Sequence, residues 1–333
     1  MPMADLFADL IGQPTAVALM RSSLEQQRLA AAYLLSGPEG VGRRLGGLRF
    51  LEGVLAGPAG APAVRRRLSQ GNHPDLLWLE PTYSHQGRLV PVSQAMAEGV
   101  SKRGLPQIRL EQIRSVGPFL ARRAVAGPRP VVVIEAVELM AEGAANGLLK
   151  TLEEPGAGLL LLLSTAPERL LSTIRSRCQQ IPFRPLDPVA MAEVLAQQTD
   201  ATQASGATDA ADTFGAPEAT DPPELIELAA GAPGALLEHR RQWRGLPSGL
   251  AERLGGLPAD PLEAMALARD LSEALDLDQQ LWLLNWWQLC LWRREPRLPQ
   301  QHRLERLRGQ LRGFVQPRLA WEVALLELSG VIV

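Results

Sequence analysis

Residues 31–45 read AAYLLSGPEGVGRRL, an apolar run that leads into a glycine-rich loop. A working phosphate-binding loop has the pattern G-x-x-x-x-G-K-[ST]: its glycines let backbone N–H groups close on phosphates, its lysine reaches the terminal phosphates, and its hydroxyl holds magnesium. Gly37, Gly40 and Gly42 keep the glycines here, whereas Arg43 and Arg44 replace the lysine and the hydroxyl. The stretch therefore predicts a strand, a loop and a helix, with a degenerate phosphate site.

Length and composition limit the class of protein. The 333 residues exceed a single domain of about 100–150 residues, so we expect two or three domains. The 34 basic and 36 acidic residues do not make the strongly basic body that holds nucleic acid by charge alone. Two cysteines, Cys178 and Cys290, fit a reducing compartment. We find no signal peptide and no apolar run of about 18 residues, and expect a cytoplasmic protein without a membrane partner.

Apolar runs alternate with helical patterns in the first half of the chain. The predicted strands are AAYLLSG (31–37), PDLLWLEP (74–81), PVVVIEA (130–136) and LLLLLSTAP (159–167). Helical spacing covers 105–123, and a second helix is expected to end at Pro155. This alternation predicts a parallel α/β sheet, in which ligands bind at the carboxyl ends of the strands.

The character of the chain changes after the segment PFRPLDP (182–188). Residues 199–224 are rich in Ala, Thr, Asp, Gly and Pro, and we expect a disordered insertion there because they bury too little apolar surface to fold alone. Helical patterning resumes at 225 and continues to the end. Trp282, Trp286 and Leu289 recur on one helical face, which indicates a helical core or a subunit-packing face.

Six segments in a fixed order carry a family resemblance: LFADLIGQ (6–13), GPEGVGRR (37–44), VVVIEAVEL (131–139), NGLLKTLEEP (146–155), LLSTAPERL (162–170) and IRSRCQQIPFRPL (174–186). Together they resemble the clamp-loader branch of the AAA+ ATPases, and within it the delta-prime family of the bacterial DNA polymerase III clamp loader. The resemblance implies an AAA+-type parallel sheet with flanking helices (1–184), a small helical lid that contains the insertion (185–243) and a C-terminal helical collar for oligomerisation (244–333).

The ATP-hydrolysing relatives, called gamma or tau, need four groups that this chain lacks. Besides the lysine and the hydroxyl, these are an aspartate, replaced by Glu135, and a catalytic glutamate, replaced by Ala136. Losing a general base costs about 100- to 10,000-fold in rate, so Ala136 weighs most. Gly234 falls near the family's nucleotide-sensing arginine, and Thr165 matches its sensor position. We expect no intrinsic ATPase activity and no bound cofactor, although Arg43 could still grip a phosphate and Glu135 could still reach a cation.

Arg177, in the segment IRSRC, resembles the family's arginine finger. A guanidinium keeps its charge and presents a fixed fork of donors, so it can stabilise charge on a γ-phosphate bound to a neighbouring subunit. The alternative is an ordinary surface ion pair, which is typical of an isolated arginine. The motif favours the finger, which would act in trans.

Three charged residues of NGLLKTLEEP have two open interpretations. Lys150, Glu153 and Glu154 line a partner or DNA surface, as the resemblance implies, or they are the exposed charges of a helix. The four-cysteine zinc module that this family commonly carries has no counterpart in 55–75, which contains no cysteine, so we expect no zinc and no other metal site.

The resemblance implies a subunit without ATPase activity in the clamp-loader complex. Its partners would be the gamma or tau and delta subunits, the sliding clamp and primer-template DNA, with ATP and Mg²⁺ held by the motor subunits. Two alternatives stay open at this point: an active gamma- or tau-like ATPase with unusual motifs, and a diverged AAA+ interaction protein outside replication.

Overall fold

The computed structural model describes residues 5–85, 87–95, 97–100, 105–205, 222–313 and 315–330. The chain forms two compact units, Met1–Gln197 with Ala232–Gly234, and Gln198–Gly231 with Ala235–Val333. The three domains expected from the sequence stay a prediction. In the described part of the chain, no helix is long and apolar enough to cross a membrane.

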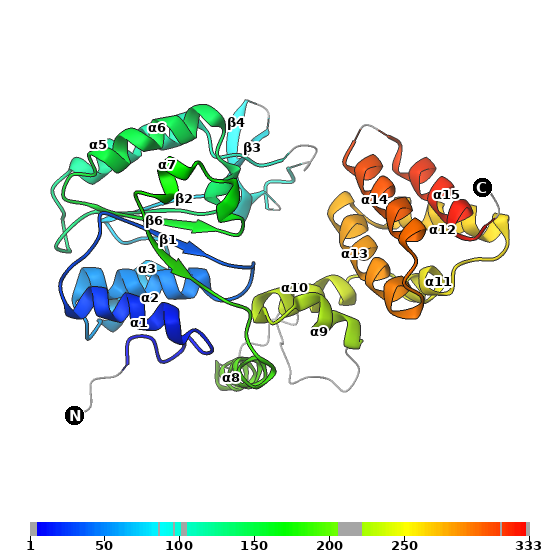
Figure 1. The fold of residues 1–333 in the computed structure, drawn as a ribbon, viewed down its shortest axis with the longest axis horizontal. Coiled ribbons are helices and arrows are strands. Elements are labelled where there is room, and N and C mark those ends of the chain that lie inside the picture. Colours follow the sequence, from blue (N-terminus) through cyan, green and yellow to red (C-terminus); the bar gives the residue numbers. More distant parts are fainter. Residues whose placement is uncertain are drawn as a thin grey trace. The chain divides into compact units, whose positions relative to one another are not determined.

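Within the described residues, five parallel strands form the main sheet of the first unit, in the order β2, β5, β6, β1, β7 (Figure 1). They are β1 (Ala32–Ser36), β2 (Leu76–Leu79), β5 (Val131–Ile134), β6 (Leu159–Ser164) and β7 (Gln179–Pro182). The side chains of β5 are fully buried, as expected for a parallel strand covered by helices on both faces. The predicted parallel sheet and its four predicted strands are confirmed.

Helices cover both faces of this sheet (Figure 1). On one face lie α1 (Pro14–Glu25), α2 (Arg43–Ala56) and α3 (Pro62–Ser69), and on the other lie α5 (Val116–Ala121), α6 (Glu142–Glu153) and α7 (Ser172–Arg175). The helix expected over 105–123 is shorter and broken at Ser115 into α4 (Leu110–Arg114) and α5. Pro118 explains the break, because its ring clashes with the carbonyl of Arg114 and it has no N–H to continue the ladder.

The sequence pattern did not predict three strands. β7 is an edge strand in which Ile181 is buried and Gln179 and Gln180 are exposed, so it lacks the apolar run that marked the others. The hairpin of β3 (Thr82–His85) and β4 (Arg88–Pro91) is short and mixed in polarity. Short 3₁₀ turns complete this unit: η1 (Val92–Gln94), η2 (Val137–Leu139) and η3 (Pro167–Arg169).

The strand register defines two opposite edges of the sheet. Ser36 pairs with Ser164 on one side and with Pro182 on the other, so the carboxyl ends of β1, β6 and β7 meet at one edge. Gln179 pairs with Tyr33, so the chain enters β7 from the opposite, amino edge. Helix α6 returns from the carboxyl edge to the amino edge because it joins the end of β5 to the start of β6.

Helices make up the second unit in the part of the chain that the structure describes. These are α9 (Pro223–Ala229), α10 (Pro233–Arg244, from Ala235 on), α11 (Leu250–Gly256), α12 (Pro261–Ala274), α13 (Leu277–Arg294), α14 (Leu298–Arg312) and α15 (Pro317–Leu328). Helix α8 (Pro188–Ser205) extends seven residues into the predicted insertion, and α9 takes in its end. Residues 206–221 of the insertion lie outside the described residues.

Tryptophans build the core of the second unit. Trp287 and Trp321 are fully buried with ring centroids 6.1 Å apart, and the Trp321 Nε1–H donates to Gln280 over 2.9 Å. Trp282 and Trp286 are also buried, whereas Leu289 is partly exposed. The tryptophans of the predicted face therefore pack within this unit, and the helical C-terminal region expected from the sequence is confirmed.

Candidate functional site

The glycine loop joins β1 to α2 at the carboxyl edge of the sheet. Gly42 precedes the first turn of α2 with φ of +100°, a conformation that residues with a Cβ rarely adopt. A Cβ at Gly37 would lie 2.4 Å from the carbonyl oxygen of Phe183, just after edge strand β7. The backbone of the loop therefore still requires the glycines of a phosphate loop.

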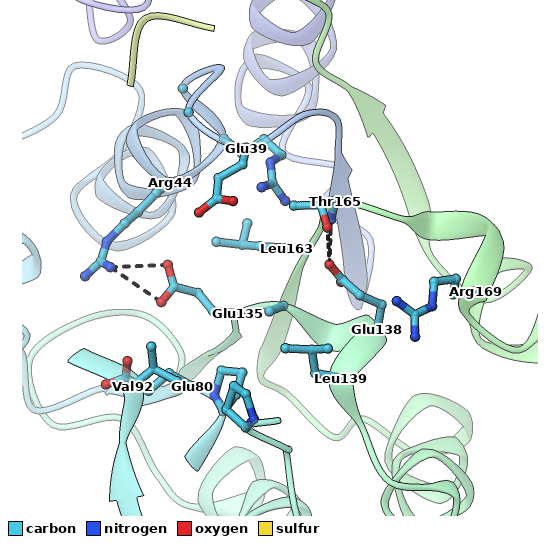
Figure 2. A pocket seen from close by; sticks show the side chains of 16 residues that line it. Glu39, Arg44, Glu80, Val92, Glu135, Glu138, Leu139, Leu163, Thr165 and Arg169 are labelled. Atoms are coloured by element: carbon cyan, nitrogen blue, oxygen red, sulfur yellow. Dashed lines mark hydrogen bonds and ion pairs between the residues drawn. The ribbon is translucent and has the colours of Figure 1, made fainter. Parts of the chain in front are cut away.

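A cavity of about 610 Å³ opens beside this loop, and we call it the loop cavity. Figure 2 shows its side chains, which come from the loop, from the segments after β2 and β5 and from the end of β6. It brings together most of the predicted nucleotide-site residues: Gly40, Gly42, Arg43, Glu135, Ala136 and Thr165. Among the described residues, its charged lining consists of Glu39, Glu80, Glu135, Glu138, Arg43, Arg44 and Arg169. Four glutamates thus face three arginines, so the charged lining is close to balanced with one carboxylate in excess.

Arg44 and Glu135 form an ion pair at the two positions where a motor subunit would hold magnesium. The Arg44 guanidinium donates to both carboxylate oxygens of Glu135, over 3.3 and 3.4 Å (Figure 2). Trp78 in β2 donates its Nε1–H to the same carboxylate over 3.1 Å, and its ring lies 4.7 Å from the Arg44 guanidinium carbon. These residues do not fit a magnesium ion, because a guanidinium cannot ligate a cation and it already engages the carboxylate.

Arg43, at the position of the phosphate-binding lysine, is directed to its own loop. Its Nε–H donates to the carbonyl oxygen of Pro38 over 3.2 Å. Burial lowers the pKa of Arg43, and nearby glutamates, Glu138 first, act in the opposite direction. Burial therefore outweighs the nearby carboxylates in the environment of this cation.

Ala136 and Thr165 stand where the resemblance puts the catalytic base and the sensor. Ala136 has φ of +46° and ψ of +50°, a left-handed conformation that costs an alanine about 1–2 kcal/mol. Thr165 donates its N–H to Glu138 over 3.0 Å, and its hydroxyl donates to the same oxygen (Figure 2). Burial raises the pKa of Glu138, but hydrogen bonds, those of Thr165 foremost, hold it below its ordinary value. The Thr165 hydroxyl is therefore engaged by a carboxylate of the same chain, and its assignment as a sensor stays a prediction.

Gly234 lies against the glycine loop, within the first unit. Its N–H donates to the carbonyl oxygen of Gly40 over 2.9 Å. A Cβ on Gly234 would come within 2.9 Å of the Gly40 Cα, closer than real Cβ contacts. At the position where the resemblance puts a sensing arginine, the structure thus has a direct backbone contact with no room for a side chain.

Arg177 lies at the amino edge of the sheet and is not among the described residues that line the loop cavity. One terminal nitrogen donates to Glu153 at the end of α6 over 3.0 Å, and the other donates to the carbonyl oxygen of Thr173 over 3.1 Å. We call Arg177, Thr173 and Glu153 the arginine edge. Its Arg177 and Glu153 side chains are 38% and 54% exposed.

The three charged residues of NGLLKTLEEP have different surroundings in the structure. Glu153 belongs to the arginine edge, whereas Lys150 and Glu154 are exposed near the C-terminal end of α6. Their role as a partner or DNA surface stays a prediction.

Two buried carboxylates organise the region where related proteins would carry zinc. Glu52 accepts the Ala61 N–H over 3.0 Å and pairs with Arg65 at 2.7 Å. Asp75 is fully buried and accepts the N–H groups of residues 125, 126 and 127, each at 2.7 Å. Burial raises the Asp75 pKa, but these bonds hold it below its ordinary value. No cluster of three His, Cys, Asp or Glu side chains in the described residues could hold a metal ion, and the absence of zinc stays a prediction.

Sequence reasoning missed two residues of the site: Glu138, which lines the loop cavity, and Trp78, which contacts Arg44 and Glu135. Glu138 follows Glu135 by three residues within a quoted motif, so a search for further carboxylates there would have found it. Trp78 gave a weaker signal, a large aromatic residue in an otherwise aliphatic strand. Its contact with Arg44 depends on β2 lying beside β5.

Comparison with known proteins covers both units. The family described as "DNA polymerase III, delta subunit" matches residues 12–187, and "Cyanobacterial DNA polymerase III delta prime, C-terminal domain" matches 189–328. DNA polymerase III subunit delta' of Bacillus subtilis is 32% identical over 192 residues, 56% of this chain and 52% of that protein. The Pseudomonas aeruginosa delta' subunit is 38% identical over 158 residues, 45% and 42% of the two chains. The matched part thus spans about half the length of these relatives.

A gamma subunit-related protein from Thermotoga maritima has the same fold, with a TM-score of 0.55 at 16% identity over 95% of this chain and 99% of that one. The parallel sheet, its order and the glycine loop after β1 define an AAA+-type fold, as the resemblance implied. The family matches assign it further. The chain belongs to the delta-prime family of DNA polymerase III clamp-loader subunits.

Proposed function

We propose that this chain is a stator of the clamp loader: it hydrolyses no ATP itself and donates Arg177 to the nucleotide of a neighbouring motor subunit. The gamma or tau subunits would hold ATP and Mg²⁺, and the complex with delta would place the sliding clamp on primer-template DNA in the cytoplasm. Arg177 would stabilise the negative charge that develops on the γ-phosphate.

The observation that carries this proposal is the separation of Arg177 from the chain's own loop cavity. The loop cavity lies at the carboxyl edge of the sheet, whereas Arg177 precedes β7 at the amino edge. The four residues of β7 alone span about 13 Å at 3.3 Å per residue. An arginine in this place serves a nucleotide on another subunit, since its own cavity lies across the sheet.

The lining of the loop cavity supports the absence of ATPase activity. Arg44 forms an ion pair with the carboxylate of Glu135, and the Ala136 side chain cannot accept a proton from water. Without a metal-holding pair and a general base, in-line attack on a phosphoryl group has neither charge neutralisation nor an activated water. A gamma- or tau-like motor would need both.

The decisive experiment measures ATP hydrolysis by a loader reconstituted from this chain, motor subunits and delta, stimulated by clamp and primed DNA. Arg177→Ala is expected to lower turnover tenfold or more, and Arg177→Lys to restore only part of it, because lysine keeps the charge but not the fork of donors. Assembly of each variant is checked by size-exclusion chromatography.

Unchanged turnover in a fully assembled Arg177→Ala loader would contradict the finger. ATP turnover by the isolated chain would favour the motor alternative instead. Failure to assemble with motor subunits and delta would favour an interaction protein outside replication.

A further inference from the structure

The Arg177 guanidinium is folded back onto its own chain. One terminal nitrogen donates to the Glu153 carboxylate and the other to the Thr173 carbonyl. The nitrogens that would form a fork on a phosphate are therefore both engaged. A phosphate that takes both terminal nitrogens therefore competes with Glu153 for the guanidinium.

Electrostatics favour this resting position. Glu153 is the last residue of α6 and Glu154 follows it, so two carboxylates lie at the negative end of a helix dipole. A cation at this end is stabilising, and Arg177 provides one. The pair is nevertheless exposed on both sides, and exposed pairs are weak and easily exchanged for another anion.

We propose that Glu153 is a positioning residue that holds Arg177 back until the terminal phosphate of a neighbour's nucleoside triphosphate displaces its carboxylate. This inference rests on the proposed function, because it concerns when the same arginine engages. Carboxylate and phosphate compete for one guanidinium, which stays charged throughout. Glu153 thereby suppresses hydrolysis by loaders in which the subunit interface is not fully closed.

The chain offers a matched control on the same helix. Glu153→Gln keeps the size of the side chain but removes its charge, while Glu142→Gln makes the same change at the exposed first residue of α6. In the reconstituted loader without clamp and DNA, Glu153→Gln is expected to raise ATP turnover about two- to fivefold, the range set by an exposed ion pair. With saturating clamp and DNA the increase is expected to vanish, and Glu142→Gln is expected to change neither rate.

The double variant with Arg177→Ala separates this inference from the proposed function. If Glu153 acts through Arg177, Glu153→Gln has no effect on turnover once the arginine is gone. Two results would overturn the inference: Glu153→Gln raises turnover equally in the Arg177→Ala background, or it does not raise turnover in the parent protein. Neither result would contradict the proposed role of Arg177 as an arginine finger. Arg177→Ala with normal turnover would overturn the proposed function itself.

A second measurement needs only the isolated chain. Phenylglyoxal labels guanidinium groups, and mass spectrometry of the peptide that contains Arg177 gives its labelling rate. Glu153→Gln is expected to raise this rate about two- to fivefold over the parent and over Glu142→Gln. An unchanged rate would mean that Glu153 does not hold the guanidinium, and the inference would fail.

Discussion

The loop cavity and the arginine edge both contain an arginine paired with a glutamate, but the two pairs differ in their surroundings. The Glu135 side chain is 19% exposed and also accepts a bond from Trp78, whereas Glu153 is 54% exposed. The arginines rank the other way, with Arg44 62% and Arg177 38% exposed. The first pair closes off a place where a metal would bind. The Arg177–Glu153 pair leaves the Arg177 guanidinium accessible to another anion. The buried carboxylate and the bond from Trp78 therefore distinguish the Arg44–Glu135 pair from the Arg177–Glu153 pair.

The largest expected effect tests the first half of this comparison. Changing Arg43→Lys, Arg44→Thr and Glu135→Asp together is expected to raise affinity for Mg–ATP at least a hundredfold, since each restored charge-assisted contact contributes about 1.5–3 kcal/mol. Titration calorimetry with a non-hydrolysable ATP analogue measures the change, and EDTA should abolish the gain. Equal affinities of parent and variant for Mg–ATP would mean that the loop backbone, or its contact with Gly234, prevents nucleotide binding. Arg177→Ala should leave the affinity unchanged.

The next effect concerns the contact between Gly234 and the glycine loop. Gly234→Ala is expected to lower the free energy of unfolding by about 1–3 kcal/mol, because its Cβ would meet the Gly40 backbone, which cannot move aside cheaply. Gly143→Ala in α6 is the control, since its Cβ would meet nothing within 4 Å. Urea unfolding followed by circular dichroism checks both. A neutral Gly234→Ala would show that the loop yields, and that a sensor side chain could be accommodated there.

The smallest effect compares the two ion pairs directly. Glu135→Gln is expected to cost about 1 kcal/mol of unfolding free energy, because it weakens the bonds of a largely buried carboxylate to two donors. Glu153→Gln is expected to cost less than about 0.5 kcal/mol, as for an exposed pair. The same urea titration measures both. Equal losses of unfolding free energy for Glu153→Gln and Glu135→Gln would mean that the Arg177–Glu153 pair stabilises the fold as much as the Arg44–Glu135 pair does. The distinction between the two regions would then fail.

The parallel sheet and most site positions could be predicted from local pattern. Buried parallel strands are continuous apolar runs in the sequence, so β1, β5 and β6 could be predicted. The loop glycines identified the positions of Arg43 and Arg44. The edge strand β7 and the break at Ser115 were not predicted. An edge strand buries few side chains, and a proline inside an apolar helical pattern interrupts hydrogen bonds without changing the pattern.

The sequence by itself determined which side chains are present and which chemistry they exclude: no lysine at 43, no hydroxyl at 44 and no base at 136. Only the tertiary structure decided what those side chains contact. Arg44 meets Glu135 across 91 residues, Gly234 reaches Gly40 across 194, and Arg177 pairs with Glu153 across 24. The physical reason is that periodicity and turn chemistry act within a few residues, whereas these contacts depend on strand order and on the helices that return the chain between the two edges of the sheet.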